Sequence, residues 1–118
     1  MSVNNKNKLR LKRHKRNRKN IYGTSKVPRL YIFKSLKNFY VNIVDDETGK
    51  TLISESSLQL KDSNSKDNDL ITKEIADNLA SKASSLGIKE IVFDKSGYKY
   101  HGRIKKLADQ LREKGLSF

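Results

Sequence analysis

The stretch RLYIFKSLKNFYVNIV, residues 29–44, decides the fold of this chain. Its first part, Arg29–Ser35, is rich in residues that favour strands, and the part Asn38–Val44 places apolar side chains at alternate positions. A short Leu-Lys pair separates the two parts, which is typical of two strands joined by a tight connection. The stretch therefore predicts a β-hairpin with one face turned to the core.

The segments that follow the hairpin predict the rest of an α/β fold. Asp45–Lys50 is a polar turn, and Thr51–Ser56 predicts a third strand. A helical period over residues 69–87 predicts a helix, Lys89–Phe93 a short strand, and Gly102–Lys114 a final helix. The order is βββαβα. Because a helix connects the third and fourth strands, we expect the fourth strand to run parallel to a neighbour in a mixed sheet.

The charge of the chain is concentrated in its first third. Lys and Arg number 26 against 13 Asp and Glu, and residues 1–44 contain half of the basic residues but no acidic one. Residues 4–20 include only two apolar side chains, Leu9 and Leu11, so this segment can bury little apolar surface. We therefore expect a disordered basic tail over residues 1–26 and one folded domain over residues 27–118. This asymmetry is typical of a chain that binds a polyanion.

The composition excludes several classes of protein. A chain of 118 residues suits a single domain, and the absence of Cys excludes disulfides and thiolate metal sites. No apolar run approaches the roughly 18 residues of a membrane span, and the basic N-terminus lacks the apolar part of a signal peptide. We expect a soluble, cytoplasmic protein with neither a membrane partner nor a small-molecule substrate.

The acidic residues offer little support for catalysis. Asp45, Asp46, Glu47 and Asp94 could in principle converge on a metal, but a turn explains the first three and a loop cap explains Asp94. The sequence has no P-loop, no Ser nucleophile elbow and no His and carboxylate spacing of a metal site. We therefore expect no catalytic residue, no metal, no cofactor and no enzyme activity.

Candidate RNA-binding residues fall in the tail, at the tip of the hairpin, and in the loop FDKSGYKYHGR, residues 93–103. The cations suit phosphates, the aromatic rings suit unpaired bases, and the loop glycines permit close backbone approach. Each region also has an alternative without RNA: the tail could be merely solvated, the hairpin aromatics could pack under a second layer, and the loop Tyr rings could pack over the end of the sheet. We expect one of the two loop Tyr rings to pack over the sheet and the other to face the partner. The candidate set is Lys8, Arg10, Lys12, Arg13, Lys15, Arg16, Arg18, Lys19, Arg29, Lys34, Ser35, Lys37, Asn38, Tyr40, Lys95, Tyr98, Tyr100, His101, Gly102 and Arg103.

The chain resembles the bacterial-type member of the large-subunit ribosomal protein family numbered eighteen. The resemblance is carried by the basic tail and by two stretches, PRLYIFKSLKNFYVNIVDDETGKTL (28–52) and GIKEIVFDKSGYKYHGRIKKLADQLREKGLSF (87–118). The main departure is the polar stretch 61–68. The resemblance implies a three-layer α/β domain of the translational-machinery type, with ribonuclease H-like topology but without the metal-binding carboxylates of that fold. It implies binding to 5S rRNA, attachment of 5S to 23S rRNA in the central protuberance, and neighbouring large-subunit proteins as partners. A general nucleic-acid-binding or RNA-chaperone module, or a degenerate nuclease, are the alternatives.

Overall fold

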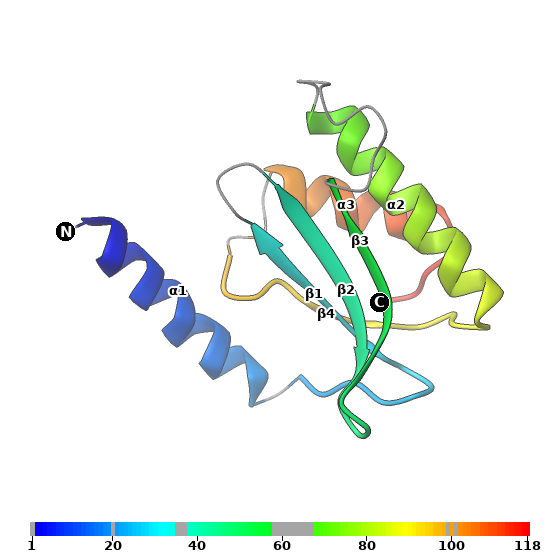
Figure 1. Ribbon diagram of the computed structural model, residues 1–118, viewed down its shortest axis with the longest axis horizontal. Coiled ribbons are helices and arrows are strands. Elements are labelled where there is room, and N and C mark those ends of the chain that lie inside the picture. The colour runs from blue at the N-terminus through cyan, green and yellow to red at the C-terminus, as the bar shows by residue number, and fades with distance from the viewer. Residues whose placement is uncertain (1, 20, 35–37, 58–67, 99, 101) are drawn as a thin grey trace.

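The computed structural model describes residues 2–19, 21–34, 38–57, 68–98, 100 and 102–118. The predicted βββαβα order is confirmed, and an additional helix precedes it (Figure 1). The strand and helix ends differ from the predicted ones by a few residues at most, and no helix in the described ranges is long and apolar enough to cross a membrane. The elements are α1 (Ser2–Arg18), β1 (Arg29–Lys34), β2 (Phe39–Asp45), β3 (Lys50–Ser56), α2 (Asn68–Ser85), β4 (Val92–Asp94) and α3 (Gly102–Glu113).

The four strands form one mixed sheet in the order β3-β2-β1-β4. β2 pairs antiparallel with both β1 and β3, and in the first pair Phe33 lies opposite Tyr40. β4 pairs in parallel with β1, which places Leu30 beside Phe93. The parallel pair confirms the predicted crossover connection through α2. β4 is consequently an edge strand of the described sheet.

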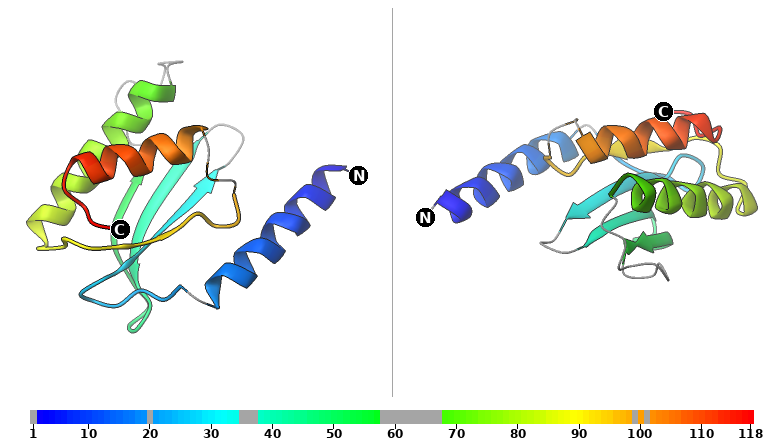
Figure 2. Two further views of the ribbon diagram at one scale, coloured as in Figure 1. Left: turned by 180° about the vertical axis from the view of Figure 1, so that it is seen from behind. Right: turned by 90° about the horizontal axis from the view of Figure 1, so that it is seen from above.

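The core lies between one face of the sheet and the helices α2 and α3. Leu30 of β1 and Phe39 of β2 are fully buried and belong to one cluster with Leu79 of α2 and Leu107 of α3. Figure 2 shows α2 and α3 together on one side of the strands. The described core therefore has two layers, not the three that the resemblance implied. On the opposite face of the sheet, Phe33 remains 47% exposed.

The N-terminal segment corrects the prediction of a disordered tail, because Ser2–Arg18 forms the helix α1. No Gly or Pro interrupts this segment. α1 lies beyond the β4 edge of the sheet, apart from α2 and α3 (Figure 1). The prediction was wrong because it considered only apolar burial, whereas α1 is held by polar contacts of its own basic side chains. The polar loop predicted over residues 61–68 lies almost entirely outside the described residues.

Candidate nucleic-acid interface

α1 is bonded to the turn that follows β4. Arg10 Nη1 donates a hydrogen bond to Ser96 O at 3.0 Å, and Arg13 Nε donates one to Gly97 O at 3.0 Å. His14 Nε2 lies 3.1 Å from a carboxylate oxygen of Asp94. Positions 10, 13 and 14 lie on one side of a helix, because residues three or four apart are neighbours there. This docking side joins the N-terminal helix to the turn at residues 94–97.

Gly97 permits the close approach of α1 to this turn. Its φ is +81°, in the left-handed region that favours glycine. A Cβ at this position would lie 2.3 Å from Arg10 O and 3.0 Å from His14 N. From the sequence, Gly97 is expected in a loop that can approach phosphate closely. The structure shows that the close approach at Gly97 is made by the backbone of α1.

Arg29 connects two carboxylates at the same end of the sheet. Its guanidinium donates to both oxygens of Asp46, at 2.9 and 3.1 Å, and to Asp94 Oδ2 at 2.8 Å. Asp94 is fully buried. Asp46 also accepts a bond from Gly23 N at 2.8 Å and lies 3.6 Å from Arg18 Nη1. The side chain of Arg29, a candidate RNA ligand, is therefore already engaged within the fold.

These contacts shift the pKa values of both partners in the Arg29–Asp46 pair. Burial lowers the pKa of Arg29, but hydrogen bonds and charge interactions with Asp46 and Asp94 outweigh it and leave the pKa above its usual value. Burial raises the pKa of Asp46, but hydrogen bonds from Arg29 and Gly23, together with the charges of Arg29 and Arg18, leave that pKa below its usual value. Both groups are charged at neutral pH, so their two parallel bonds form a bidentate ion pair.

Three of the four carboxylates considered as metal ligands, Asp45, Asp46 and Asp94, have structural partners. Asp45 accepts bonds from Glu47 N and the Thr48 hydroxyl, as predicted for a turn. Asp94 Oδ1 accepts a bond from Ser96 N at 2.9 Å, as predicted for a loop cap. Within the described residues, no three His, Asp or Glu side chains are grouped so that they could hold a metal ion. This end of the sheet is a site of ion pairing within the fold.

Five other described cations form a row, which we call the cationic row: Lys8, Lys12, Lys15 and Arg16 of α1, and Lys19 directly after it. All five side chains are exposed. Their spacing of three or four residues places them on one side of the helix, away from the docking side. At about 1.5 Å of rise per residue, the row is about 16 Å long. Like charges at this spacing disfavour an isolated helix, so the row itself is not a sequence signal for α1.

The loop after β4 separates its two Tyr side chains. Tyr98 packs against the core, its hydroxyl accepts a bond from Lys34 N at 3.2 Å, and the Arg10 guanidinium lies 4.7 Å from its ring centroid. Tyr100 is 40% exposed and meets the ring of Phe93 edge-on. One Tyr therefore packs over the sheet, as predicted. Contact of Tyr100 with RNA stays a prediction.

Arg103 is turned into the fold. Its half-buried guanidinium lies 4.4 Å from the ring centroid of Phe39, and its Nε donates to Thr72 Oγ1 at 3.0 Å. Burial lowers the pKa of Arg103. Arg103 is a candidate because of its charge at the start of a helix, and its sequence position does not indicate these two neighbours. Contact of Arg103 with RNA stays a prediction, and it would compete with the contacts within the fold.

The open face of the sheet carries the aromatic residues of the hairpin. The ring centroids of Phe33 and Tyr40 are 5.7 Å apart, with Lys34 exposed beside them and Asn38 half-buried before β2. Gly102 is exposed at the first position of α3. Three candidates, and with them the centre of the hairpin tip, lie outside the described residues: Ser35, Lys37 and His101.

The sequence of the chain matches one family of known proteins over nearly its whole length. The family model described as "Ribosomal L18 of archaea, bacteria, mitoch. and chloroplast" matches residues 4–118. The large ribosomal subunit protein uL18 of Ruminiclostridium cellulolyticum is 53% identical over 117 residues, which are 97% of this chain and 96% of that protein. The uL18 proteins of Petrotoga mobilis and Clostridium kluyveri are 52% and 50% identical, each over 96% of this chain and 95% of their own. The chain thus belongs to the L18 family of ribosomal proteins.

Proposed function

We propose that this protein is a structural component of the large ribosomal subunit that binds 5S rRNA and helps attach it to 23S rRNA in the central protuberance. The cationic row is the observation that carries the RNA-binding part of this proposal. Family membership supports the ribosomal role, since the relatives are named as large-subunit proteins. The sequence resemblance supports 5S rRNA as the partner, with 23S rRNA and neighbouring large-subunit proteins as the further partners.

The cations of α1 divide into paired and unpaired groups. Arg10, Arg13 and Arg18 donate hydrogen bonds to backbone oxygens of the chain. Within the described residues, no side chain of the cationic row lies within ion-pair distance of a carboxylate. Phosphates that approach the row would displace its counterions, which favours binding and makes it dependent on salt. Because α1 is already helical, RNA does not have to order the row during binding.

The open sheet face supplies a second surface for RNA. Phe33 and Tyr40 present neighbouring aromatic rings there, and the exposed Lys34, the last residue of β1, follows Phe33. Aromatic rings stack on unpaired bases, whereas cations contact phosphates. The exposed Tyr100 lies on the other side of the sheet, where Arg112 of α3 donates a bond to its hydroxyl, and it offers a further aromatic ring there. We propose that these residues contact irregular parts of the rRNA.

We also infer a ribonuclease H-like topology, and a division into a tail over residues 1–26 and a domain over residues 27–118. The strand order β3-β2-β1-β4, with β4 parallel to β1, supports the topology. Gly23 N donates to Asp46, and Asp46 N donates to Gly23 O at 3.1 Å. The segment around Gly23 therefore packs with the domain, and α1 contacts the domain through its docking side.

A competition assay at one fixed salt concentration tests this function. We expect unlabelled 5S rRNA to displace labelled 5S rRNA from the full chain at much lower concentration than tRNA or duplex DNA. A site that matches the shape of one RNA adds contacts that phosphates alone do not supply. Equal displacement by all three competitors would contradict the proposal and would indicate a general nucleic-acid-binding or RNA-chaperone module.

Removing three charges from the cationic row is expected to weaken 5S rRNA binding and to reduce its salt dependence. Each lost phosphate contact removes about 0.7 to 0.9 from the slope of log affinity against log salt concentration. The combined change Lys12→Gln, Lys15→Gln and Arg16→Gln is therefore expected to lower this slope by about 2. Affinity is measured from low to moderate salt for the parent and the variant.

A matched control removes the same net charge elsewhere. Lys73, Lys89 and Lys105 are exposed on α2, before β4 and on α3, all outside the cationic row. Their combined change to Gln is expected to leave the slope close to that of the parent. If affinity and its salt-dependence slope fall equally in the two triple variants, the position of the charges does not matter. The cationic row is then not the binding surface.

A further inference from the structure

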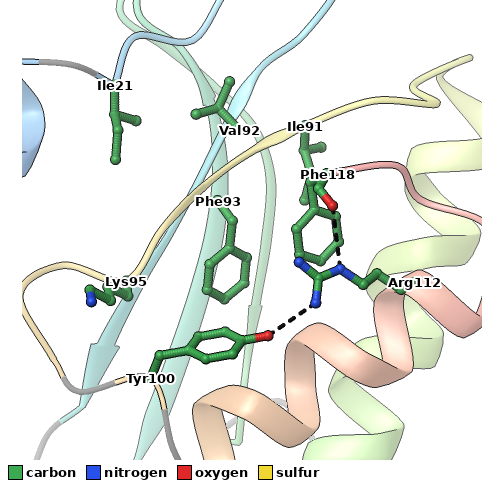
Figure 3. A pocket seen from close by; sticks show the side chains of 8 residues that line it. All are labelled: Ile21, Ile91, Val92, Phe93, Lys95, Tyr100, Arg112 and Phe118. Atoms are coloured by element: carbon green, nitrogen blue, oxygen red, sulfur yellow. Dashed lines mark hydrogen bonds between the residues drawn. The ribbon is translucent and has the colours of Figure 1, made fainter.

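An aromatic groove of about 590 Å³ lies along the edge strand β4, and the function proposed above does not require it (Figure 3). Six of its lining side chains are apolar or aromatic, and the other two are the cations Lys95 and Arg112. No acidic side chain is among the described residues that line it. The groove is consequently apolar along its length and positively charged at its rim.

Three aromatic rings form one wall of the groove. The rings of Phe93 and Phe118 are nearly parallel, with an interplanar angle of 9° and centroids 5.3 Å apart. Tyr100 meets Phe93 edge-on, at 6.2 Å between centroids and an angle of 90°. Figure 3 shows these rings gathered on one side of β4. Flat apolar surfaces of this kind stack well on a planar guest such as a nucleobase.

The two cations flank this wall. Arg112 donates to the Tyr100 hydroxyl at 3.1 Å and to Phe118 O at 3.3 Å, and its guanidinium lies 4.4 Å from the Phe118 ring centroid. These contacts hold the guanidinium plane at the rim, where Arg planes can stack on bases or contact phosphate. Lys95 lies on the opposite side of Phe93 from Arg112 (Figure 3). If a base lay between Lys95 and Arg112, each of the two phosphates that flank its nucleotide would have a cation nearby.

We propose that this groove binds one unpaired nucleotide of the rRNA, with its base against the aromatic rings and its phosphates near Lys95 and Arg112. The proposal rests on the RNA-binding function and adds a nucleotide site to it. Ile21, two positions after the last cation of the row, also lines the groove, so the end of the row lies near this site. An extended peptide along β4 is the alternative occupant, but flat aromatic rings beside two basic side chains favour a nucleotide.

The test removes one aromatic ring at a time and measures 5S rRNA affinity of the full chain. Tyr100→Leu and Phe118→Leu keep an apolar side chain but lose a flat ring, and each is expected to weaken binding about tenfold, as for one lost base stack. Tyr100→Phe keeps the ring and is expected to bind within about twofold of the parent. Tyr22→Leu is the control, because Tyr22 is 57% exposed and lies outside the groove.

Thermal unfolding of each variant separates binding from folding. The proposal is overturned if either Leu variant in the groove binds like the parent, if its affinity falls only with its folded fraction, or if Tyr22→Leu loses as much affinity. In these cases 5S rRNA binding by the parent still stands. If the parent itself shows no preference for 5S rRNA, the proposed function is wrong, and the nucleotide site is rejected with it.

Discussion

Gly97→Ala is expected to detach α1 from the domain. A left-handed φ costs a non-glycine residue about 1 kcal/mol, and the new Cβ would lie 2.3 Å from Arg10 O, so α1 has to move. The bonds from Arg10 and Arg13 and the His14 contact would then be lost together. RNA would have to order the freed segment at about 1–2 kcal/mol per residue, so 5S rRNA affinity is expected to fall roughly tenfold or more. Far-UV circular dichroism and hydrogen exchange at the α1 amides measure the detachment.

Gly87→Ala is the matched control for this variant. Gly87 has a similar φ of +75°, but a Cβ there would meet nothing within 4 Å. It therefore carries the backbone strain without the contact with α1. We expect a lower thermal midpoint but unchanged protection of α1 and unchanged RNA affinity. If Gly97→Ala keeps the protection of the α1 amides, the close approach at Gly97 is not what holds the helix.

Arg29→Met is expected to lower the free energy of unfolding by about 3 kcal/mol or more. Asp94 is fully buried, and its shortest contact is the 2.8 Å bond from Arg29. Removing one partner of a buried ion pair leaves the other charge uncompensated, which typically costs about 3–5 kcal/mol. Asp46 would lose its bidentate partner as well. Urea denaturation in the absence of RNA measures this loss.

A second substitution tests the cause of this loss. Asp94→Asn in the Arg29→Met background removes the uncompensated charge, so the double variant is expected to recover part of the lost stability. Arg29→Lys keeps the charge but loses the planar guanidinium that makes the bidentate pair. Its free energy of unfolding is therefore expected to lie between those of the parent and of Arg29→Met. A loss below about 1 kcal/mol for Arg29→Met, the range of exposed ion pairs, would show that the buried network contributes little.

The sheet could be predicted because its signals are local. Phe39, Val41 and Ile43 alternate along a single strand, and all three are buried on the core face. The parallel position of β4 followed from the helix between β3 and β4, since only a crossover connection joins parallel strands. The order of the strands and helices after α1 could therefore be predicted from local sequence patterns alone.

The candidate site was harder to predict because its contacts join distant parts of the chain. His14 and Asp94 are separated by 80 positions, and Arg29 and Asp94 by 65. The sequence shows that Arg29 and Arg103 are positive, but not that the first is paired with two carboxylates or that the second lies over the Phe39 ring. Charge alone therefore grouped these two residues with the exposed cations of α1.

The docking of α1 on the turn at residues 94–97 has a consequence for synthesis of the chain. The ribosome makes α1 before the turn that holds it, which is about 80 residues later, and at roughly 5–20 residues per second this takes several seconds. During this interval the partners that hold Arg10, Arg13 and His14 in the described structure have not yet been made. The basic helix can thus meet cellular nucleic acids before it can dock, so premature binding competes with folding until β4 and its turn are complete.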